Sequence, residues 1–183
     1  MQSIIENLLE LSHVENGQFS AKLTNVALKP LFERLVSELQ VYAPTAQLKL
    51  SFPDAESGFT ALFAHADENM LHEVLTILLT NSVRYSPEPA LITLAAKKID
   101  LESNKIEITV TDCGYGISKE ALPHVFERFY REDKAHTRKS NSGSGLGLSI
   151  ANALIAAMGA EIFVNETQSK KDASSGTCVT IIL

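Results

Sequence analysis

Residues 78–87 read LLTNSVRYSP and close a long helix that the sequence predicts from Asp67 to Tyr85. Asp67 is a suitable N-cap, because its carboxylate can accept hydrogen bonds from the first free amides of a helix. Apolar residues at helical spacing form the buried stripe of this helix, namely Leu71, Val74, Leu75 and Leu78. Asn81 lies away from that stripe, on the face that also carries Ile77 and Tyr85.

The polar end of this helix suggests a site for magnesium and phosphate. The amide oxygen of Asn81 is a hard, neutral ligand that suits magnesium and does not repel phosphate oxygens. Arg84, three residues later on the same face, could meet phosphate charge. Taken alone, the two residues fit an ordinary solvated helix end as well, because asparagine is common there.

A second segment, residues 112–117, reads DCGYGI and follows a predicted strand that ends at Asp112. A carboxylate in this position can accept a hydrogen bond from an exocyclic amine such as that of adenine, and it can reject a base without that donor. Gly114 and Gly116 would let the backbone approach a flat ring closely. The alternative is a tight turn closed by a bond from the Asp112 side chain to the backbone.

A third segment, residues 143–148, reads GSGLGL and opens a predicted helix. Free amides at a helix N-terminus bind phosphate, and glycines allow its close approach. The glycine spacing does not fit the dinucleotide-binding fingerprint, and the chain contains no P-loop pattern. A flexible hinge explains the segment as well when it is taken alone.

The chain between these two glycine segments predicts a lid. Residues 125–131 read VFERFYR and precede a charged, polar loop up to residue 142. Lys134, Arg138 and Lys139 make this loop basic within an acidic protein, which favours contact with phosphate. The functional interpretation is a lid that closes over a nucleotide, and the alternative is an anchored surface loop.

The order and spacing of these segments resemble the catalytic domain of sensor histidine kinases, which share a fold with gyrase-type and chaperone-type ATPases. The resemblance covers about residues 25–183. Its elements occur in the family's order: the asparagine box at 78–87, the first glycine box at 112–117, the phenylalanine box at 126–131, the second glycine box at 143–148 and the glycine-threonine element at Gly176-Thr177.

The resemblance implies an α/β two-layer sandwich with a mixed, mostly antiparallel sheet covered on one face by helices. The predicted order of elements, which ends in a hairpin, also favours such a sandwich over a doubly wound parallel sheet. We expect residues 1–20 to form the end of the second helix of a dimerisation hairpin and a linker, and residues 21–183 to form the ATP-binding domain. The helical spacing of apolar residues in 4–11 fits equally well with ordinary packing on the domain.

The resemblance also implies a site for ATP and Mg²⁺, with Asn81 as the metal ligand. It gives catalytic roles to Asn81, Arg84 and Arg131. It gives nucleotide contacts to a larger set, drawn from all of the boxes: Asn81, Arg84, Tyr85, Asp112, Gly114, Gly116, Ile117, Phe129, Gly143, Ser144, Gly145, Leu146, Gly147, Leu148 and Thr177. Within this set, Asp112 would read adenine, with Thr177 supporting the aspartate.

The reaction implied is transfer of the γ-phosphoryl group of ATP to a histidine on a dimerisation hairpin that is absent from this chain, for relay to a response regulator. The five histidines of this chain lack the setting of such an acceptor. The resemblance further implies a homodimeric full-length protein, a monomeric isolated domain, and a cytoplasmic domain of an inner-membrane sensor. A net charge of -6 without a basic stripe argues against nucleic-acid binding.

Two positions depart from the family's pattern. Ile77 stands where the asparagine box usually carries another asparagine, and Cys113 stands where asparagine usually follows the aspartate. Related ATPases place a water-activating glutamate at the first position, so Ile77 argues against simple ATP hydrolysis. It also leaves the alternative of a degenerate nucleotide-binding domain with weak kinase activity, in a protein that acts mainly as a phosphatase or scaffold.

Overall fold

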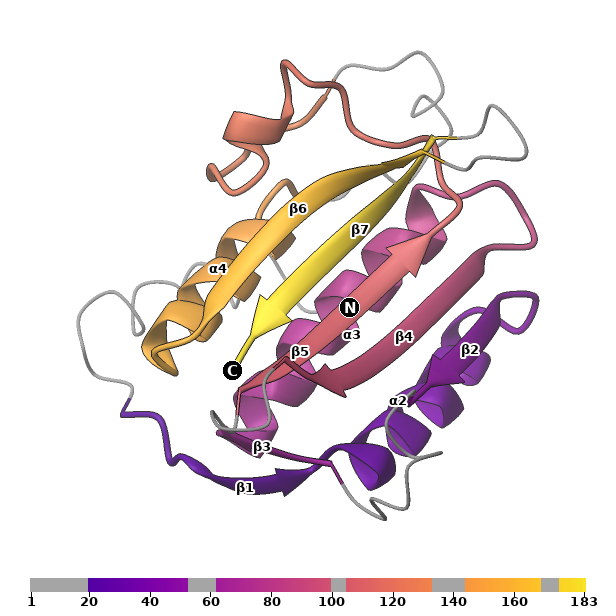
Figure 1. Ribbon diagram of the computed structural model, residues 1–183. Helices are drawn as coiled ribbons and strands as arrows, with labels where there is room; N and C mark the ends of the chain where they lie inside the picture. Colours follow the sequence, from indigo (N-terminus) through magenta and orange to yellow (C-terminus); the bar gives the residue numbers. More distant parts are fainter. Residues whose placement is uncertain (1–19, 53–61, 100–104, 133–143, 169–174) are drawn as a thin grey trace.

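Two layers make up the described part of the chain: helices pack against one face of a five-stranded sheet, and none of the described helices lies on the other face (Figure 1). The computed structural model describes residues 20–52, 62–99, 105–132, 144–168 and 175–183. The predicted α/β sandwich is confirmed. The segment predicted to belong to a dimerisation hairpin, residues 1–20, lies outside the described residues except for its last position.

The sheet has the strand order β2-β4-β5-β7-β6. Its strands are β2 (Gln47–Ser51), β4 (Leu91–Lys98), β5 (Ile106–Asp112), β6 (Glu161–Gln168) and β7 (Ser175–Ile182). Only the pairing of β2 with β4 is parallel, and all other neighbours are antiparallel, as expected for a mixed and mostly antiparallel sheet. Burial alternates along the whole of β5, so Ile108 and Val110 face the helices while their neighbours face outward.

The helices that cover the sheet are α2 (Leu28–Tyr42), α3 (Glu68–Arg84) and α4 (Gly147–Ala157). Helix α3 occupies the centre, and its apolar stripe is buried in the core, as the sequence predicts. Asp67 is its N-cap, since its Oδ1 accepts hydrogen bonds from the amides of Asn69 (3.1 Å) and Met70 (3.2 Å). This cap fixes the start of the helix whose other end carries Asn81.

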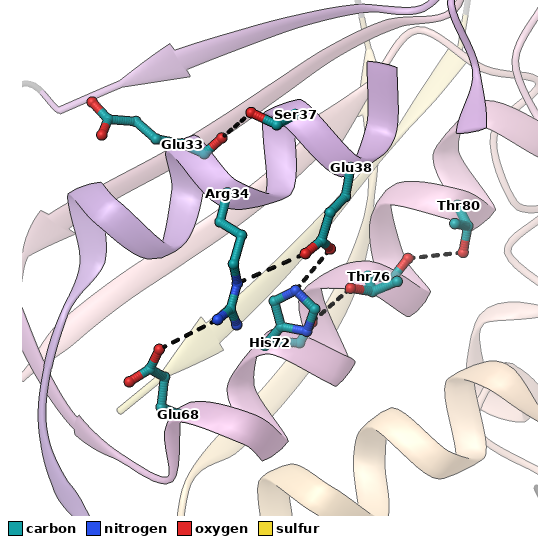
Figure 2. A network of polar contacts seen from close by, with 8 residues as sticks. All are labelled: Glu33, Arg34, Ser37, Glu38, Glu68, His72, Thr76 and Thr80. Atoms are coloured by element: carbon teal, nitrogen blue, oxygen red, sulfur yellow. Dashed lines mark hydrogen bonds and ion pairs between the residues drawn. The ribbon is translucent and has the colours of Figure 1, made fainter. Parts of the chain in front are cut away.

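Polar contacts join α2 to the first half of α3, far along the helix from Asn81 (Figure 2). Arg34 Nη1 lies 3.7 Å from Glu68 Oε1, and His72 Nε2 lies 2.8 Å from Glu38 Oε2. Because at least one side chain of each pair is about half exposed, each pair contributes less than about 1 kcal/mol. The buried apolar residues of the two helices therefore dominate their packing.

A second, two-stranded sheet lies beside the start of α2. Strand β1 (Thr24–Ala27) pairs antiparallel with β3 (Phe63–Ala66), and β1 runs directly into α2. The sequence gives no sign of β1, because four residues are too few to show an alternation of apolar and polar side chains. Among the described residues, no helix is both long enough and apolar enough to cross a membrane.

Candidate functional site

A cavity of about 150 Å³ lies at the end of the sheet where β5 and α3 terminate. Residues 113–132, which follow β5, pass beyond this end of the sheet and include a short 3-10 helix, η2 (Leu122–His124) (Figure 1). Eight of the predicted site residues line the cavity, and they come from every predicted box: Asn81, Tyr85, Asp112, Gly116, Ile117, Arg131, Leu148 and Thr177. The structure thus brings together segments that are far apart in the sequence.

Asp112 is the buried anchor of the cavity, with 7% of its surface exposed. Its Oδ1 accepts hydrogen bonds from the amides of Gly114 (2.9 Å) and Thr177 (3.1 Å). Its Oδ2 accepts one from Ser82 Oγ (2.9 Å). The bond to Gly114 is the tight-turn bond that the sequence offered as an alternative. The turn and the binding site are therefore compatible, since the turn holds the carboxylate at the cavity wall.

Glycine is required at position 114 because the backbone there passes close to the backbone of Tyr85. A Cβ at this position would lie 2.5 Å from the carbonyl oxygen of Tyr85 and 2.8 Å from Asp112 Oδ1. The next amide, that of Tyr115, donates to the same Tyr85 oxygen at 3.0 Å. The first glycine segment thus caps the end of α3, which fixes the distance between Asn81 and Asp112.

The second glycine segment passes closely over the same helix. A Cβ on Gly147 would lie 3.2 Å from Ile77 Cγ2 and 3.7 Å from Asn81 Nδ2. Ile77 packs against the hydrophobic core and is partly buried. The N-terminus of α4 therefore lies beside Asn81. The apolar side chain of Ile77 packs against Gly147.

The phenylalanine segment touches the second glycine segment through its backbone. The amide of Phe129 donates to the carbonyl oxygen of Gly145 at 3.0 Å, and both residues have positive φ (61° and 74°). A Cβ on Gly145 would lie 2.9 Å from the carbonyl carbon of Phe129, so glycine is needed there. The Phe129 side chain is 56% exposed and is not among the residues that line the cavity. The following residues, Tyr130 and Arg131, do line it.

Other predicted site residues surround the cavity without lining it. Arg84 is exposed at the end of α3, and Leu146 is fully buried in the core, so only its backbone can reach a ligand. The remaining described residues of this group do not line the cavity either: Gly114, Phe129, Ser144, Gly145 and Gly147. Gly143 and the basic residues Lys134, Arg138 and Lys139 lie outside the described residues.

The structure adds residues that the sequence does not single out. Most of them are apolar or aromatic and come from segments on all sides of the cavity: Leu78, Ser82, Tyr115, Ala121, Val125, Tyr130, Glu132, Val164 and Val179. Their alternating or helical spacing predicts burial but not the cavity they share. Ser82 had no signal of its own, because its partner Asp112 is thirty residues away.

Residues 66–183 match the family described as histidine kinase-, DNA gyrase B- and HSP90-like ATPases. The sensor-like histidine kinase SenX3 of Mycolicibacterium smegmatis is 34% identical over 150 residues, which are 82% of this chain and 37% of SenX3. The sensor histidine kinase YkoH of Bacillus subtilis is 38% identical over 126 residues, which are 69% of this chain and 25% of YkoH. The chain thus spans about a third or less of the length of these relatives.

Solved structures share the fold. The mycobacterial sensor histidine kinase MprB superposes with a TM-score of 0.71 at 23% identity, covering 88% of this chain and 96% of the MprB chain. Full-length ShkA in complex with AMPPNP superposes with a TM-score of 0.76 at 22% identity, covering 97% of this chain and 34% of ShkA. At these identities the likeness concerns the arrangement of helices and strands.

Proposed function

Because the chain belongs to the family of histidine kinase-, DNA gyrase B- and HSP90-like ATPases and carries the ATP-binding domain of a sensor histidine kinase, we propose that it transfers the γ-phosphoryl group of ATP to a histidine on a dimerisation hairpin. The observation that carries the proposal is the shared cavity. Asn81 and Asp112, the two residues with the most specific predicted roles, line it together with Arg131.

Asp112 is the proposed reader of adenine. Three protein donors occupy its carboxylate, and a carboxylate offers about four acceptor positions, so one position remains for the exocyclic amine of the base. The apolar side chains of Leu78, Ile117 and Val179 line the same cavity and would pack on the faces and edges of the ring. A guanine would instead present a carbonyl oxygen to the carboxylate, which is repulsive.

Asn81 is the proposed ligand of Mg²⁺. In the part of the chain that the structure describes, no cluster of three or more His, Cys, Asp or Glu residues could hold a metal ion. A single amide oxygen suits magnesium, because this ion is commonly held by few protein groups together with substrate phosphates and water. When bound, Mg²⁺ neutralises charge that develops on the transferred phosphoryl group.

The phosphates are proposed to lie between Asn81 and the N-terminus of α4. The first amides of a helix have no acceptor within it and carry a partial positive charge, so they attract phosphate. Arg131 lines the cavity, and Arg84 is exposed beside it, so both can add positive charge. The protein's contribution to the reaction would then be positioning and charge stabilisation.

The partners of the reaction are proposed from the family. They are ATP, the phosphoacceptor hairpin of the same protein and a response regulator. We also propose that residues 1–20 end that hairpin, that the full-length protein is a homodimer with the isolated domain a monomer, and that the domain lies on the cytoplasmic side of a membrane sensor.

Ile77 favours a second candidate, a domain that binds nucleotide but phosphorylates poorly. Its side chain lies beside Gly147 and supplies no polar atom next to Asn81. To separate the two, this chain is mixed with the matching histidine-bearing hairpin and radiolabelled ATP. Acid-labile label on the hairpin supports the kinase. Clear ATP binding without label transfer contradicts it and favours the degenerate domain.

A further inference from the structure

Ser82 is a buried polar residue that the proposed chemistry does not use. It follows Asn81 on α3, only 5% of its surface is exposed, and it lines the cavity. Its hydroxyl oxygen lies 2.9 Å from Oδ2 of Asp112, in a buried contact between α3 and the end of β5. Such a bond is made in a poorly hydrated setting, where water competes little for either partner.

The direction of this bond follows from the chemistry of the aspartate. The amides of Gly114 and Thr177 can only donate, so Oδ1 acts as an acceptor for both of them. An ionised carboxylate accepts at its second oxygen as well. The single hydroxyl proton of Ser82 is therefore directed to Oδ2, and it occupies one of the acceptor positions of that oxygen.

We propose that Ser82 is a positioning residue for base recognition, which holds Asp112 Oδ2 so that its remaining acceptor position faces the exocyclic amine of adenine. The inference rests on the proposed adenine site. Oδ1 is held by the backbone at two points, whereas among the described residues the hydrogen bond to Oδ2 comes from Ser82. Without that partner the carboxylate is held at Oδ1 alone, so the position of Oδ2 is less restricted about a terminal torsion that is intrinsically broad.

The same bond links the two ends of the nucleotide site. Ser82 and Asn81 are consecutive residues of α3, so a tie from Ser82 to Asp112 also sets the position of Asn81 relative to the adenine anchor. Base recognition and phosphate positioning then depend on one short stretch of helix.

The test compares two nucleotides by calorimetry on the full chain: ADP, and the diphosphate of purine riboside, which lacks the exocyclic amine. The variants are Ser82→Ala and the control Thr76→Ala, which removes a hydroxyl of the same helix that donates to the His72 carbonyl oxygen (2.8 Å). We expect Ser82→Ala to weaken ADP binding by about tenfold, the effect of one hydrogen bond to a charged group. Binding of the amine-free nucleotide should change by less than about twofold.

The outcomes separate this inference from the proposed function. If the wild-type chain does not prefer ADP over the amine-free nucleotide, the adenine site itself is wrong. If the wild-type chain has that preference and Ser82→Ala keeps it in full, or weakens both nucleotides equally, the role of Ser82 is overturned. Should Ser82→Ala fail to fold, Ser82→Cys, which keeps the volume and weakens the donor, is judged by the same criterion.

Discussion

Replacing Asp112 with asparagine changes one carboxylate oxygen of the buried anchor into an amide NH2 group, which is a hydrogen-bond donor. Two of the donors to this side chain, the amides of Gly114 and Thr177, can still bond to the remaining oxygen. The new amide NH2 group would face Ser82 and the cavity, where the aspartate offered an acceptor. The shape of the side chain is kept, so the change isolates its hydrogen-bonding capacity.

The expected cost follows from this change of partner. The exocyclic amine of adenine loses its acceptor and meets another donor, which costs about 1–3 kcal/mol for an unmatched buried polar group. ADP affinity should therefore fall by roughly 5-fold to 150-fold. Guanine presents a carbonyl oxygen at the same place, so the difference between ADP and GDP should narrow.

Calorimetric titration of the wild-type chain and of Asp112→Asn with ADP and GDP measures these changes in affinity. Thermal unfolding checks that Asp112→Asn is folded. Thr76→Ala is the matched control. The hydroxyl that it removes donates to the His72 carbonyl oxygen within α3, and Thr76 does not line the cavity. An unchanged ADP affinity in a folded Asp112→Asn protein would refute the assignment of this carboxylate to the base.

Three further variants test the structure around the cavity. Gly114→Ala should lower the free energy of unfolding in urea by about 1–3 kcal/mol, because its Cβ would meet the Tyr85 carbonyl oxygen at 2.5 Å. A stability equal to wild type would show that the backbone at Gly114 does not approach Tyr85 this closely. Asp67→Ala should cost about 1 kcal/mol through loss of the α3 cap while ADP affinity stays unchanged, and a stability equal to wild type would contradict the cap. Ile77→Asn should raise label transfer to the hairpin; a folded variant without any gain would mean that Ile77 is not what limits the reaction.

The fold was predictable where local signals agree with the final structure. The α3 helix has both a capping residue and an apolar stripe, and the strand that ends at Asp112 alternates along its whole length. Strand β1 was missed because its stability comes from pairing with β3, which lies far along the chain. The helix that the sequence predicts to open within residues 143–148 begins at Gly147, since the positive φ of Gly145 is incompatible with a right-handed helix.

The sequence indicates some residues of the candidate site but not the contacts that join them. Asp112 and Asn81 stand in segments with distinctive residues, so the sequence indicates them directly. Ser82 bonds to Asp112 across two secondary-structure elements, and no local pattern indicates such a contact. Phe129, which the sequence also predicts in the site, has a positive φ of 61° and a 56% exposed side chain, and it does not line the cavity.

The most direct measurement is a crystal structure of this chain with Mg²⁺ and a non-hydrolysable ATP analogue. The account predicts the exocyclic amine of adenine within about 3 Å of Asp112 Oδ2, and the metal-bound phosphates beside Asn81 and the N-terminus of α4. A nucleotide bound outside this cavity, or bound within it with the base turned away from Asp112, would contradict the account.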